Sequence, residues 1–219
     1  MNVNEVISSI SKISYGMEVH PNDHVNMSQS TNDVFPSAIH LAAYLKIEKE
    51  LLTALEILIQ SFKDLRQRLP KLIKVARTHL QDATPITVDQ EISGWQFALE
   101  KSLGQISSNL SQLSYLALGA TAVGTGLNTY PEYPLAVAKK LSEITGLKLK
   151  TSPNKFFSLA SKNELHLVHS TLNVLAMDLL KIGNDIRLLA SGPRAGIGEY
   201  TIPSNDPGSS IISCSQSSY

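Results

Sequence analysis

The chain has 219 residues, of which 42% are hydrophobic and 17% charged, and its 19 basic side chains balance its 19 acidic ones. This composition supplies one substantial core, and an even charge without long runs of either sign argues against a nucleic-acid or anionic-membrane surface. Cys214 is the only cysteine, which excludes an internal disulfide framework and a cysteine-ligated iron–sulfur cluster and favours a reducing, cytosol-like compartment.

The first residues, 1–7, have neither the basic nor the apolar region of a signal peptide, and no transit peptide is seen. No stretch reaches the roughly 18 apolar residues of a membrane span. We therefore expect a cytoplasmic protein with no membrane partner and no nucleic-acid partner.

Residues 36–69 are predicted to form the first of three long helices, about 50 Å long at about 1.5 Å per residue. Pro36 suits a helix start and the Leu69-Pro70 step a helix stop, because proline lacks the N–H that a helix interior uses. Apolar residues recur at helical spacing through the range. They are Leu41, Leu45, Leu52, Leu55, Ile59 and Phe62.

Two further long helices are predicted at residues 88–118 and 158–189, with a short helix at 135–145 between them that Gly146 closes. The residues that step by three and four are Ile92, Trp95, Leu99, Leu103, Ile106, Leu110, Leu113 and Ala117 in the second helix and Leu165, Val168, Leu172, Leu175, Leu179, Ile182, Ile186 and Leu189 in the third. No stretch alternates with period two for long enough to indicate a sheet.

These helix lengths predict an all-α fold, a bundle of long helices. Helices of about 30 residues are far longer than the average of about 11–12. A coiled coil has the same helical period, but it does not explain the segments 19–33, 77–87 and 192–210, which are dense in small polar, His, Gly and Pro residues. We expect the chemistry to lie in these three segments.

The segment 19–33 contains a candidate anion site. Ser30, Thr31 and Asn32 stand near the start of the first helix, and their donors, with the first-turn N–H groups, suit a carboxylate or phosphate oxygen. Ordinary helix capping by Ser30 or Asn32 explains the same residues and is favoured on composition alone. The ring of His20 has two alternative roles: it could exchange protons, or it could form hydrogen bonds with the backbone.

Thr78 and His79 lie in the turn-rich segment 77–87, before the second helix. A histidine here can exchange protons near neutral pH if a carboxylate or hydroxyl orients it. A loop histidine whose ring is satisfied by the backbone is an equal alternative.

Ser209 and Ser210 end the Gly- and Pro-punctuated segment 192–210. Ser209 could act as a base only if backbone N–H groups and a nearby cation held its alkoxide, and on residue types alone a flexible surface loop is favoured. No Cys or His pair has metal-ligand spacing, and no Gly-rich phosphate loop follows a strand.

The order of the segments predicts a site shared between chains. If the first two long helices pack antiparallel, the segments that open them lie about 45 Å apart by the helical rise. One chain could not join them, so a site that uses both requires neighbouring subunits of a symmetric oligomer.

Five blocks of sequence, in order, resemble class II fumarate hydratase of the fumarase/aspartase superfamily. The blocks are residues 19–26, 28–33, 77–85, 124–129 and 190–194. His79 favours fumarase over the similar aspartase, which has Gln there, and residues 196–199 also resemble fumarase. The resemblance implies reversible hydration of fumarate to (S)-malate in the tricarboxylic acid cycle, by a homotetramer without metal or organic cofactor. Mitochondrial relatives exist beside cytoplasmic ones.

The resemblance also implies residue roles. Four residues would hold the substrate carboxylates: Ser30, Thr31, Asn32 and Thr78. His79 would handle a proton or position water, Ser209 would take the C3 proton of malate, and Ser210 would contact substrate. Proton loss beside a carboxylate creates an aci-carboxylate trianion, which requires many preorganised donors. A second, surface loop for dicarboxylates would contain His20, Asn22 and Asp23.

The chain departs from the family pattern at both ends. The amino-terminal region with its Gly- and Ser/Thr-rich substrate loop is missing, as is the Met-Pro-Gly-Lys-Val-Asn-Pro continuation after Ile211. We expect residues 1–24 to be the remnant of an amino-terminal domain, 25–211 an incomplete central helical bundle, and 212–219 a non-matching tail left by frameshift or truncation. Within the bundle, Asp89 replaces a glycine.

We expect this chain alone to be inactive or nearly so, because the missing lysine and substrate loop would remove transition-state stabilisation at several points. Two alternatives remain open. One is an aspartase-like or other lyase of the superfamily, and the other is a non-catalytic helical fragment.

Overall fold

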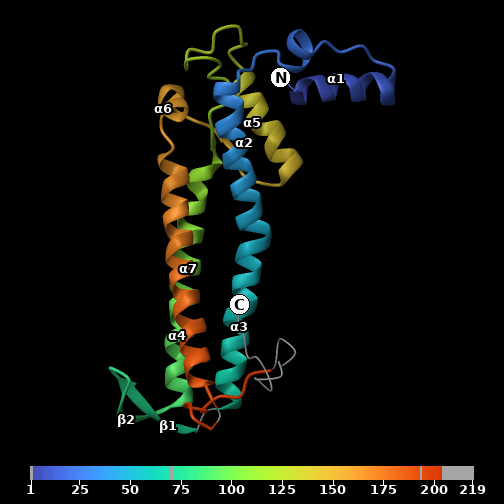
Figure 1. Cartoon of the computed structure of the whole chain (residues 1–219). Coiled ribbons are helices and arrows are strands. Elements are labelled where there is room, and N and C mark those ends of the chain that lie inside the picture. The colour runs from blue at the N-terminus through green and yellow to red at the C-terminus, as the bar shows by residue number, and fades with distance from the viewer. Residues whose placement is uncertain (1, 70–71, 193, 204–219) are drawn as a thin grey trace. The chain divides into compact units, whose positions relative to one another are not determined.

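The computed structural model describes residues 2–69, 72–192 and 194–203, which are mainly helical as predicted (Figure 1). In chain order the elements are α1 (Asn2–Tyr15), η1 (Pro21–Val25), α2 (Thr31–Lys46), η2 (Ile47–Leu51), α3 (Leu52–Arg68), β1 (Ile73–Thr78), β2 (Gln81–Thr87), α4 (Val88–Leu110), η3 (Ser111–Ser114), β3 (Tyr115–Leu116), α5 (Tyr133–Thr145), β4 (Lys150–Thr151), α6 (Lys155–Ala160) and α7 (Asn163–Leu189). None of the helices in these described ranges has an apolar stretch long enough to cross a membrane.

The chain divides into two compact units, each made of two separate stretches of sequence. Unit 1 consists of Met1–Ala54 and Ser107–His169, and unit 2 of Leu55–Ile106 and Ser170–Tyr219. Each unit therefore joins residues that lie far apart in the sequence.

The core of unit 1 forms around the short parallel pair β3–β4, in which Leu116 pairs with Thr151. Four buried leucines form its centre: Leu116, Leu118, Leu147 and Leu149. Partly buried side chains of α2 and α5 pack against them: Val34, Leu41, Tyr44, Leu45, Val137 and Leu141. Leu41 and Leu45 are thus packed against a core, as their helical spacing predicted.

A partly buried ammonium group ties α6 to this core. Lys155 Nζ donates to the carbonyls of Leu116 at 3.0 Å and Leu118 at 2.7 Å, and to the hydroxyl of Thr151. Burial lowers the pKa of Lys155 to about 8, with an opposing effect from Asp33. Each ammonium N–H therefore has an acceptor, as a buried charged donor requires.

His40 is a buried histidine in α2, with 8% of its surface exposed. Its Nδ1 lies 3.0 Å from the carbonyl oxygen of Tyr115, to which the neutral ring donates in its Nδ1–H form. Burial lowers the pKa of His40 below its ordinary value of 6.5, although the Tyr115 carbonyl and the charge of Glu164 oppose this and Lys162 adds to it.

Acid is expected to destabilise unit 1 through His40. As the pH falls below 6.5, the unfolded chain binds a proton at this ring while the folded chain resists it, so the free energy of unfolding falls. Urea unfolding on either side of that pH measures the effect, and the fall should be smaller in His40→Gln. An equal fall in the wild-type chain and in His40→Gln would show that His40 is not the group responsible.

The core of unit 2 is formed by α3, α4 and α7, which run lengthwise beside one another within this unit (Figure 1). Its buried apolar side chains include Leu55, Ile59, Phe62, Ile92, Trp95, Leu99, Ile106, Leu175, Ile182 and Leu189. All ten occupy positions that the helical spacing predicted. The Phe62 and Trp95 rings, with centroids 6.1 Å apart, join α3 to α4. Leu179 is an exception, with 41% of its surface exposed.

Several predicted boundaries were wrong. The first long helix begins at Thr31, so Pro36 lies inside it, and a π-helical turn, η2, follows α2. The second ends at Leu110, because the chain then enters η3 and the β3–β4 pair. The third is split into α6 and α7. The short helix ends as predicted, with Gly146 in the left-handed region at φ 78°.

The expectation of no sheet was also wrong, because residues 73–87 form an antiparallel hairpin of β1 and β2. Five of the seven β2 residues are exposed, so the strand has no buried face to produce an alternating pattern. Pro85 further weakened the strand signal.

Candidate active site

The amino end of α2 holds the first group of predicted site residues, Ser30, Thr31 and Asn32, in unit 1. Ser30 caps the helix, since its Oγ accepts from the backbone N–H of Asn32 at 3.2 Å. The capping interpretation therefore describes Ser30 correctly. Its hydroxyl proton remains free to donate to another acceptor, so capping and anion binding are compatible. Thr31 and Asn32 are exposed.

Asp33 organises this end of the helix from beneath. The residue is fully buried, and its Oδ1 accepts from the Ser30 N–H at 2.9 Å, completing the capping box. Its Oδ2 accepts from the N–H groups of Gly119 at 3.0 Å and Thr121 at 2.9 Å. One carboxylate thus fixes both the helix start and the loop that follows β3.

The side chain of Asn32 adds a second tie to that loop, because its amide donates to the Ala122 carbonyl at 2.7 Å. Beside it lies an open groove of about 640 Å³. The groove is lined by Thr31, Asn32, Phe35, Pro36, Ala122, Val123, Phe156, Leu159, Ala160 and Lys162. Polar donors and one cation, Lys162, therefore border an otherwise apolar hollow.

The predicted second loop, with His20, Asn22 and Asp23, forms the π-turn η1 in the same unit. His20 Nδ1 accepts from the Asp23 N–H at 3.1 Å, and the His20 N–H donates to His24 Nδ1 at 2.9 Å. Asn22 and Asp23 are exposed. A hollow of about 450 Å³ beside His20 is also lined by Lys12, which supplies a cation next to this loop.

Thr78 and His79 lie at the tip of the β1–β2 hairpin in unit 2, in place of the predicted irregular loop. Thr78 pairs with Gln81, so His79 and Leu80 alone form the turn. Both have positive φ, 51° and 60°, as in a type I′ turn, where Asn and Gly are usual. Left-handed backbone at a residue other than Gly costs about 1–3 kcal/mol, and such strain is concentrated at functional sites.

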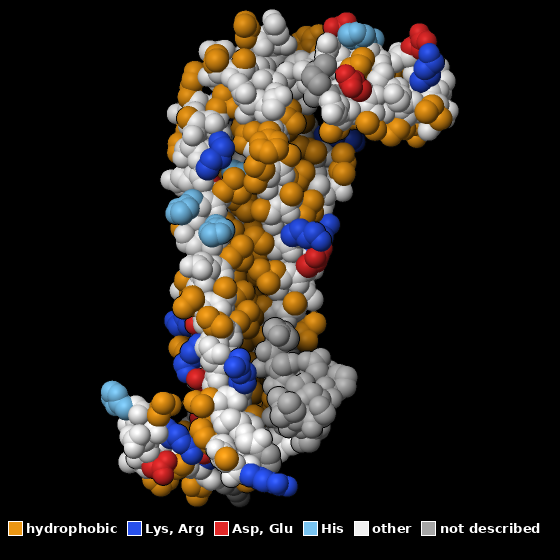
Figure 2. Space-filling model, viewed as in Figure 1, with side chains coloured by type: hydrophobic (Ala, Val, Ile, Leu, Met, Phe, Trp, Pro, Cys, Tyr) orange, Lys and Arg blue, Asp and Glu red, His pale blue; other side chains and the backbone are white. Residues whose placement is uncertain are grey.

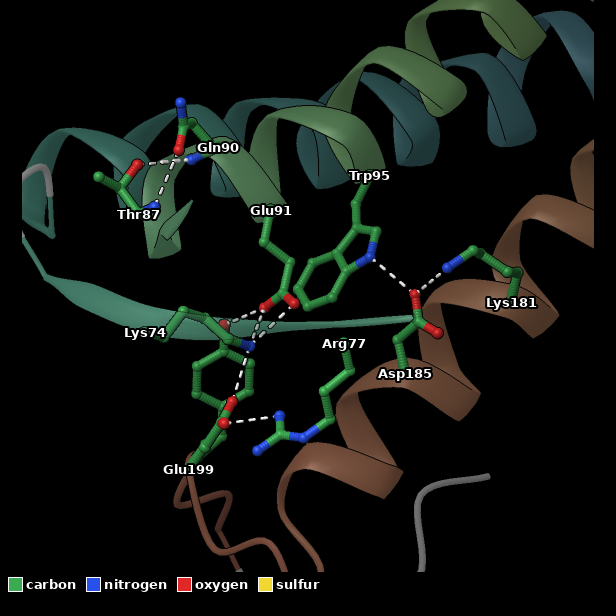
Figure 3. A network of polar contacts seen from close by, with 10 residues as sticks. Lys74, Arg77, Thr87, Gln90, Glu91, Trp95, Lys181, Asp185 and Glu199 are labelled. Atoms are coloured by element: carbon green, nitrogen blue, oxygen red, sulfur yellow. Dashed lines mark hydrogen bonds and ion pairs between the residues drawn. The ribbon is translucent and has the colours of Figure 1, made fainter. Parts of the chain in front are cut away.

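A network of charges lies at the base of this hairpin (Figure 3). Lys74 Nζ is 2.8 Å from both carboxylate oxygens of Glu91 in α4 and 2.7 Å from Glu199 Oε2. Arg77 Nη1 is 2.7 Å from Glu199 Oε1. The Tyr200 hydroxyl donates to Glu91. Two cations and two anions thus balance in a site where only 7% of the Lys74 side chain is exposed.

The electrostatics of the network follow from burial and pairing. Burial alone would raise the pKa of Glu199, but the hydrogen bonds from Lys74 and Arg77 hold it below its ordinary value. Burial raises the pKa of Tyr200, and its bond to the Glu91 carboxylate raises it further. At neutral pH the network therefore holds ionised Glu199 and neutral Tyr200.

The structure brings the site residues together in three local groups. Two of the groups lie in unit 1: the first is His20, Asn22 and Asp23, and the second is Ser30, Thr31 and Asn32. The third group, Thr78 and His79, lies in unit 2. Ser209 and Ser210, together with the predicted tail at 212–219, lie outside the described residues.

Sequence reasoning missed the residues that hold these groups in place. Asp33 had a readable signal, because an acidic residue three positions after a Ser is close to a capping-box pattern. Glu91 and Glu199 had none, since their partners lie 17 to 125 positions away and no periodicity links them.

Comparison with known proteins shows the family to which this chain is similar. The family model described as "Lyase" matches residues 1–212. Curated class II fumarate hydratases from Oceanobacillus iheyensis and Staphylococcus epidermidis are each 50% identical over 217 residues, covering 97% of this chain and 47% of their own length. The chain therefore spans about half the length of the curated relatives it matches.

Solved structures of a fumarase and of a fumarate lyase are also similar to this chain. A class II fumarase from Schistosoma mansoni matches with a TM-score of 0.89 and 37% identity, over 97% of this chain and 49% of that protein. A fumarate lyase:delta crystallin from Brucella melitensis, bound to cobalt, matches with a TM-score of 0.90 and 38% identity, over 97% and 47%.

Proposed function

The chain belongs to the lyase family whose model it matches, and from this premise we propose that its residues form part of a fumarate hydratase site. The reaction places the hydroxyl of water on C2 of fumarate and a proton on C3, giving (S)-malate. The observation that carries the proposal is the 50% identity with class II fumarate hydratases over 97% of this chain. The strained His79 turn is consistent with it.

In this proposal the donors divide by task. Ser30, Thr31 and Asn32 bind one substrate carboxylate at the amino end of α2, where their side-chain donors and the helix dipole favour an anion. Thr78 contributes to the second carboxylate. His79 positions the water or transfers a proton, and its exposed ring is free to do so.

Two further roles lie outside the described residues. Ser209 would be the base that removes the C3 proton of malate in the reverse direction, and Ser210 would contact substrate.

The loop of His20, Asn22 and Asp23 would form a separate, surface dicarboxylate site.

We further propose that other copies of the chain complete the site, in the homotetramer that the family resemblance implies. Thr31, Asn32, Thr78 and His79 are all exposed in the isolated chain. Hydrogen bonds from such donors gain little against water, and they strengthen when a second surface excludes it. A neighbouring subunit would supply that surface.

The surface of α7 supports such an assembly. Apolar side chains follow the long helices on the face seen in Figure 2. On the part of α7 in unit 2, large apolar residues are exposed at near-helical spacing: Val174, Met177, Leu180 and Leu188. A helix that is apolar on more than one face is generally covered by a further partner.

Hydration assays on two proteins test the proposed function. The purified chain is incubated with fumarate and malate is quantified by NMR; little or no turnover is expected. The second protein is a chimera in which residues 1–211 of this chain, without the predicted tail, replace the corresponding part of the Oceanobacillus iheyensis relative. The chimera should hydrate fumarate above background. A folded chimera that consumes fumarate only with ammonia would favour an aspartase-like lyase, and an inert one would favour a non-catalytic role.

Replacing His79 with asparagine in the chimera is expected to lower kcat/KM for fumarate by about 10²–10⁴-fold, the usual contribution of a general acid or base. His169→Asn is the matched control, because His169 is an exposed histidine of α7 outside the proposed site. Equal activity of both variants would remove His79 from the mechanism.

A further inference from the structure

The turn that carries His79 has no side-chain support at its tip. Thr78, His79 and Leu80 are exposed, and within the described residues the imidazole of His79 has no hydrogen-bond partner. Two consecutive left-handed residues, neither of them glycine, are retained only where the surroundings determine the conformation. Beside the turn, Thr78 pairs with Gln81 and Arg77 Nε lies 3.7 Å from the exposed Asp82 carboxylate; the shorter and more buried contacts of the hairpin lie at its base.

Glu199 supports the base of the hairpin by bridging two residues of β1. One carboxylate oxygen lies 2.7 Å from Lys74 Nζ and the other 2.7 Å from Arg77 Nη1. Residues three apart on a regular strand point to opposite faces, but the pairing register shifts between Val75 and Arg77. Such irregularities re-aim side chains, and here both cations reach one carboxylate. Arg77 directly precedes Thr78.

The segment that carries Glu199 is itself fixed to the end of α7. The Gly198 N–H donates to the Ser191 carbonyl at 2.8 Å, and the Glu199 N–H donates to the Leu189 carbonyl at 2.9 Å. The Ile197 N–H also donates to the Ser191 hydroxyl. Glu199 is therefore anchored by its own backbone, and the hairpin is held relative to α7.

A second link runs from the hairpin to α4. Lys74 binds Glu91, and Glu91 accepts from the Tyr200 hydroxyl next to Glu199 (Figure 3). The Tyr200 ring also packs edge-on against Trp95 of α4, with centroids 6.5 Å apart. The base of the hairpin is thus tied to two long helices of its unit.

We infer that Glu199 is a positioning residue for Thr78 and His79: by holding Lys74 and Arg77 it fixes the direction in which the hairpin presents them. This inference rests on the proposed function, because the presented group is the proposed proton-handling histidine. Glu199 contacts no proposed substrate atom and acts through β1. A displacement of about 1 Å in such a group can lower a rate about 10²-fold.

Backbone relaxation of the ¹⁵N-labelled full chain tests the positioning directly. In Glu199→Gln, the order parameters of the Thr78, His79 and Leu80 amides should fall from about 0.85 to below about 0.6. Arg77→Lys, which keeps the charge but loses the forked guanidinium, should lower them less. Glu100→Gln is the control, because the Glu100 carboxylate belongs to the same unit but pairs with Lys63 of α3 instead of with β1.

A purely structural role would reduce global stability without loosening the tip of the folded molecule. Unchanged order parameters at all three amides, or an equal fall in Glu100→Gln, would therefore overturn the inference. If Glu199→Gln does not fold, the order parameters of the same three amides are measured in Arg77→Lys, and unchanged values there would overturn the inference. The measurement needs no turnover, so the Glu199 effect in the chain, combined with a folded chimera that does not hydrate fumarate, would overturn the proposed function alone.

Discussion

Replacing Asp33 with asparagine is expected to lower the free energy of unfolding by about 3–5 kcal/mol. The fully buried carboxylate accepts three backbone N–H groups, from Ser30, Gly119 and Thr121. Asparagine has one acceptor oxygen and turns its NH₂ group toward at least one of these donors. Each buried donor left without an acceptor costs about 1–3 kcal/mol.

Urea unfolding followed by circular dichroism measures this loss, and amide hydrogen exchange locates it. Exchange at Gly119 and Thr121 should accelerate more than exchange in unit 2. Asp23→Asn is the control, because 78% of the Asp23 side chain is exposed. A loss below about 1 kcal/mol in Asp33→Asn, the range of an ordinary surface change, would refute the account.

Replacing Lys74 with methionine is the second change expected to have a large effect, about 3–5 kcal/mol of stability. Methionine keeps much of the side-chain volume but leaves Glu91 and Glu199 without the cation that lies between them. Removing one partner from a buried ion network leaves an uncompensated charge, which is strongly destabilising. Trp95, the only tryptophan, packs against Tyr200 in this network and reports the transition by fluorescence.

A double-mutant cycle separates loss of charge balance from loss of packing. Lys74→Met combined with Glu199→Gln restores the balance of charges and should destabilise less than the sum of the single changes. Lys63→Met is the comparison for a more exposed pair and should cost about 1 kcal/mol or less. Additive effects at Lys74 and Glu199 would show that the network acts as separate contacts.

The helices of this protein were predictable because their burial follows the helical period. Leu55, Ile59 and Phe62 in α3 repeat at three and four residues, and all three are buried. The end of α5 was predictable from Gly146, which adopts the left-handed conformation that glycine favours. In both cases the residues that the local sequence pattern favours are also the residues that the tertiary structure needs at those positions.

The hairpin and the end of α4 could not be predicted in this way. β1 and β2 have no clean buried face, and the turn at His79 and Leu80 lacks the Gly or Asn that marks such turns. The apolar run through Leu113 continues past the end of α4, because burial in η3 and β3 needs apolar residues as much as a helix does. Tertiary contacts overrode the local pattern at these places.

The sequence was sufficient to propose which residues form the candidate site, but not to predict how they are arranged in space. The position of Ser30 before a helix was sufficient to predict its capping role. The support of His79 by Glu199 runs through Arg77, which lies 122 positions before Glu199, and only the folded chain brings Arg77 and Glu199 together. The division of the chain into residues 1–24, 25–211 and 212–219 remains a prediction.

The interleaving of the two units along the chain has a consequence for synthesis on the ribosome. Two of the three donors to the Asp33 carboxylate, the N–H groups of Gly119 and Thr121, are made only 86 and 88 residues later. At about 5–20 residues per second, the nascent α2 waits about 4–17 s for them. Unit 2 is delayed in the same way, because Lys74 must wait for Glu199. During translation the apolar faces of the early helices are therefore exposed together, and shielding by a chaperone would matter most in that interval.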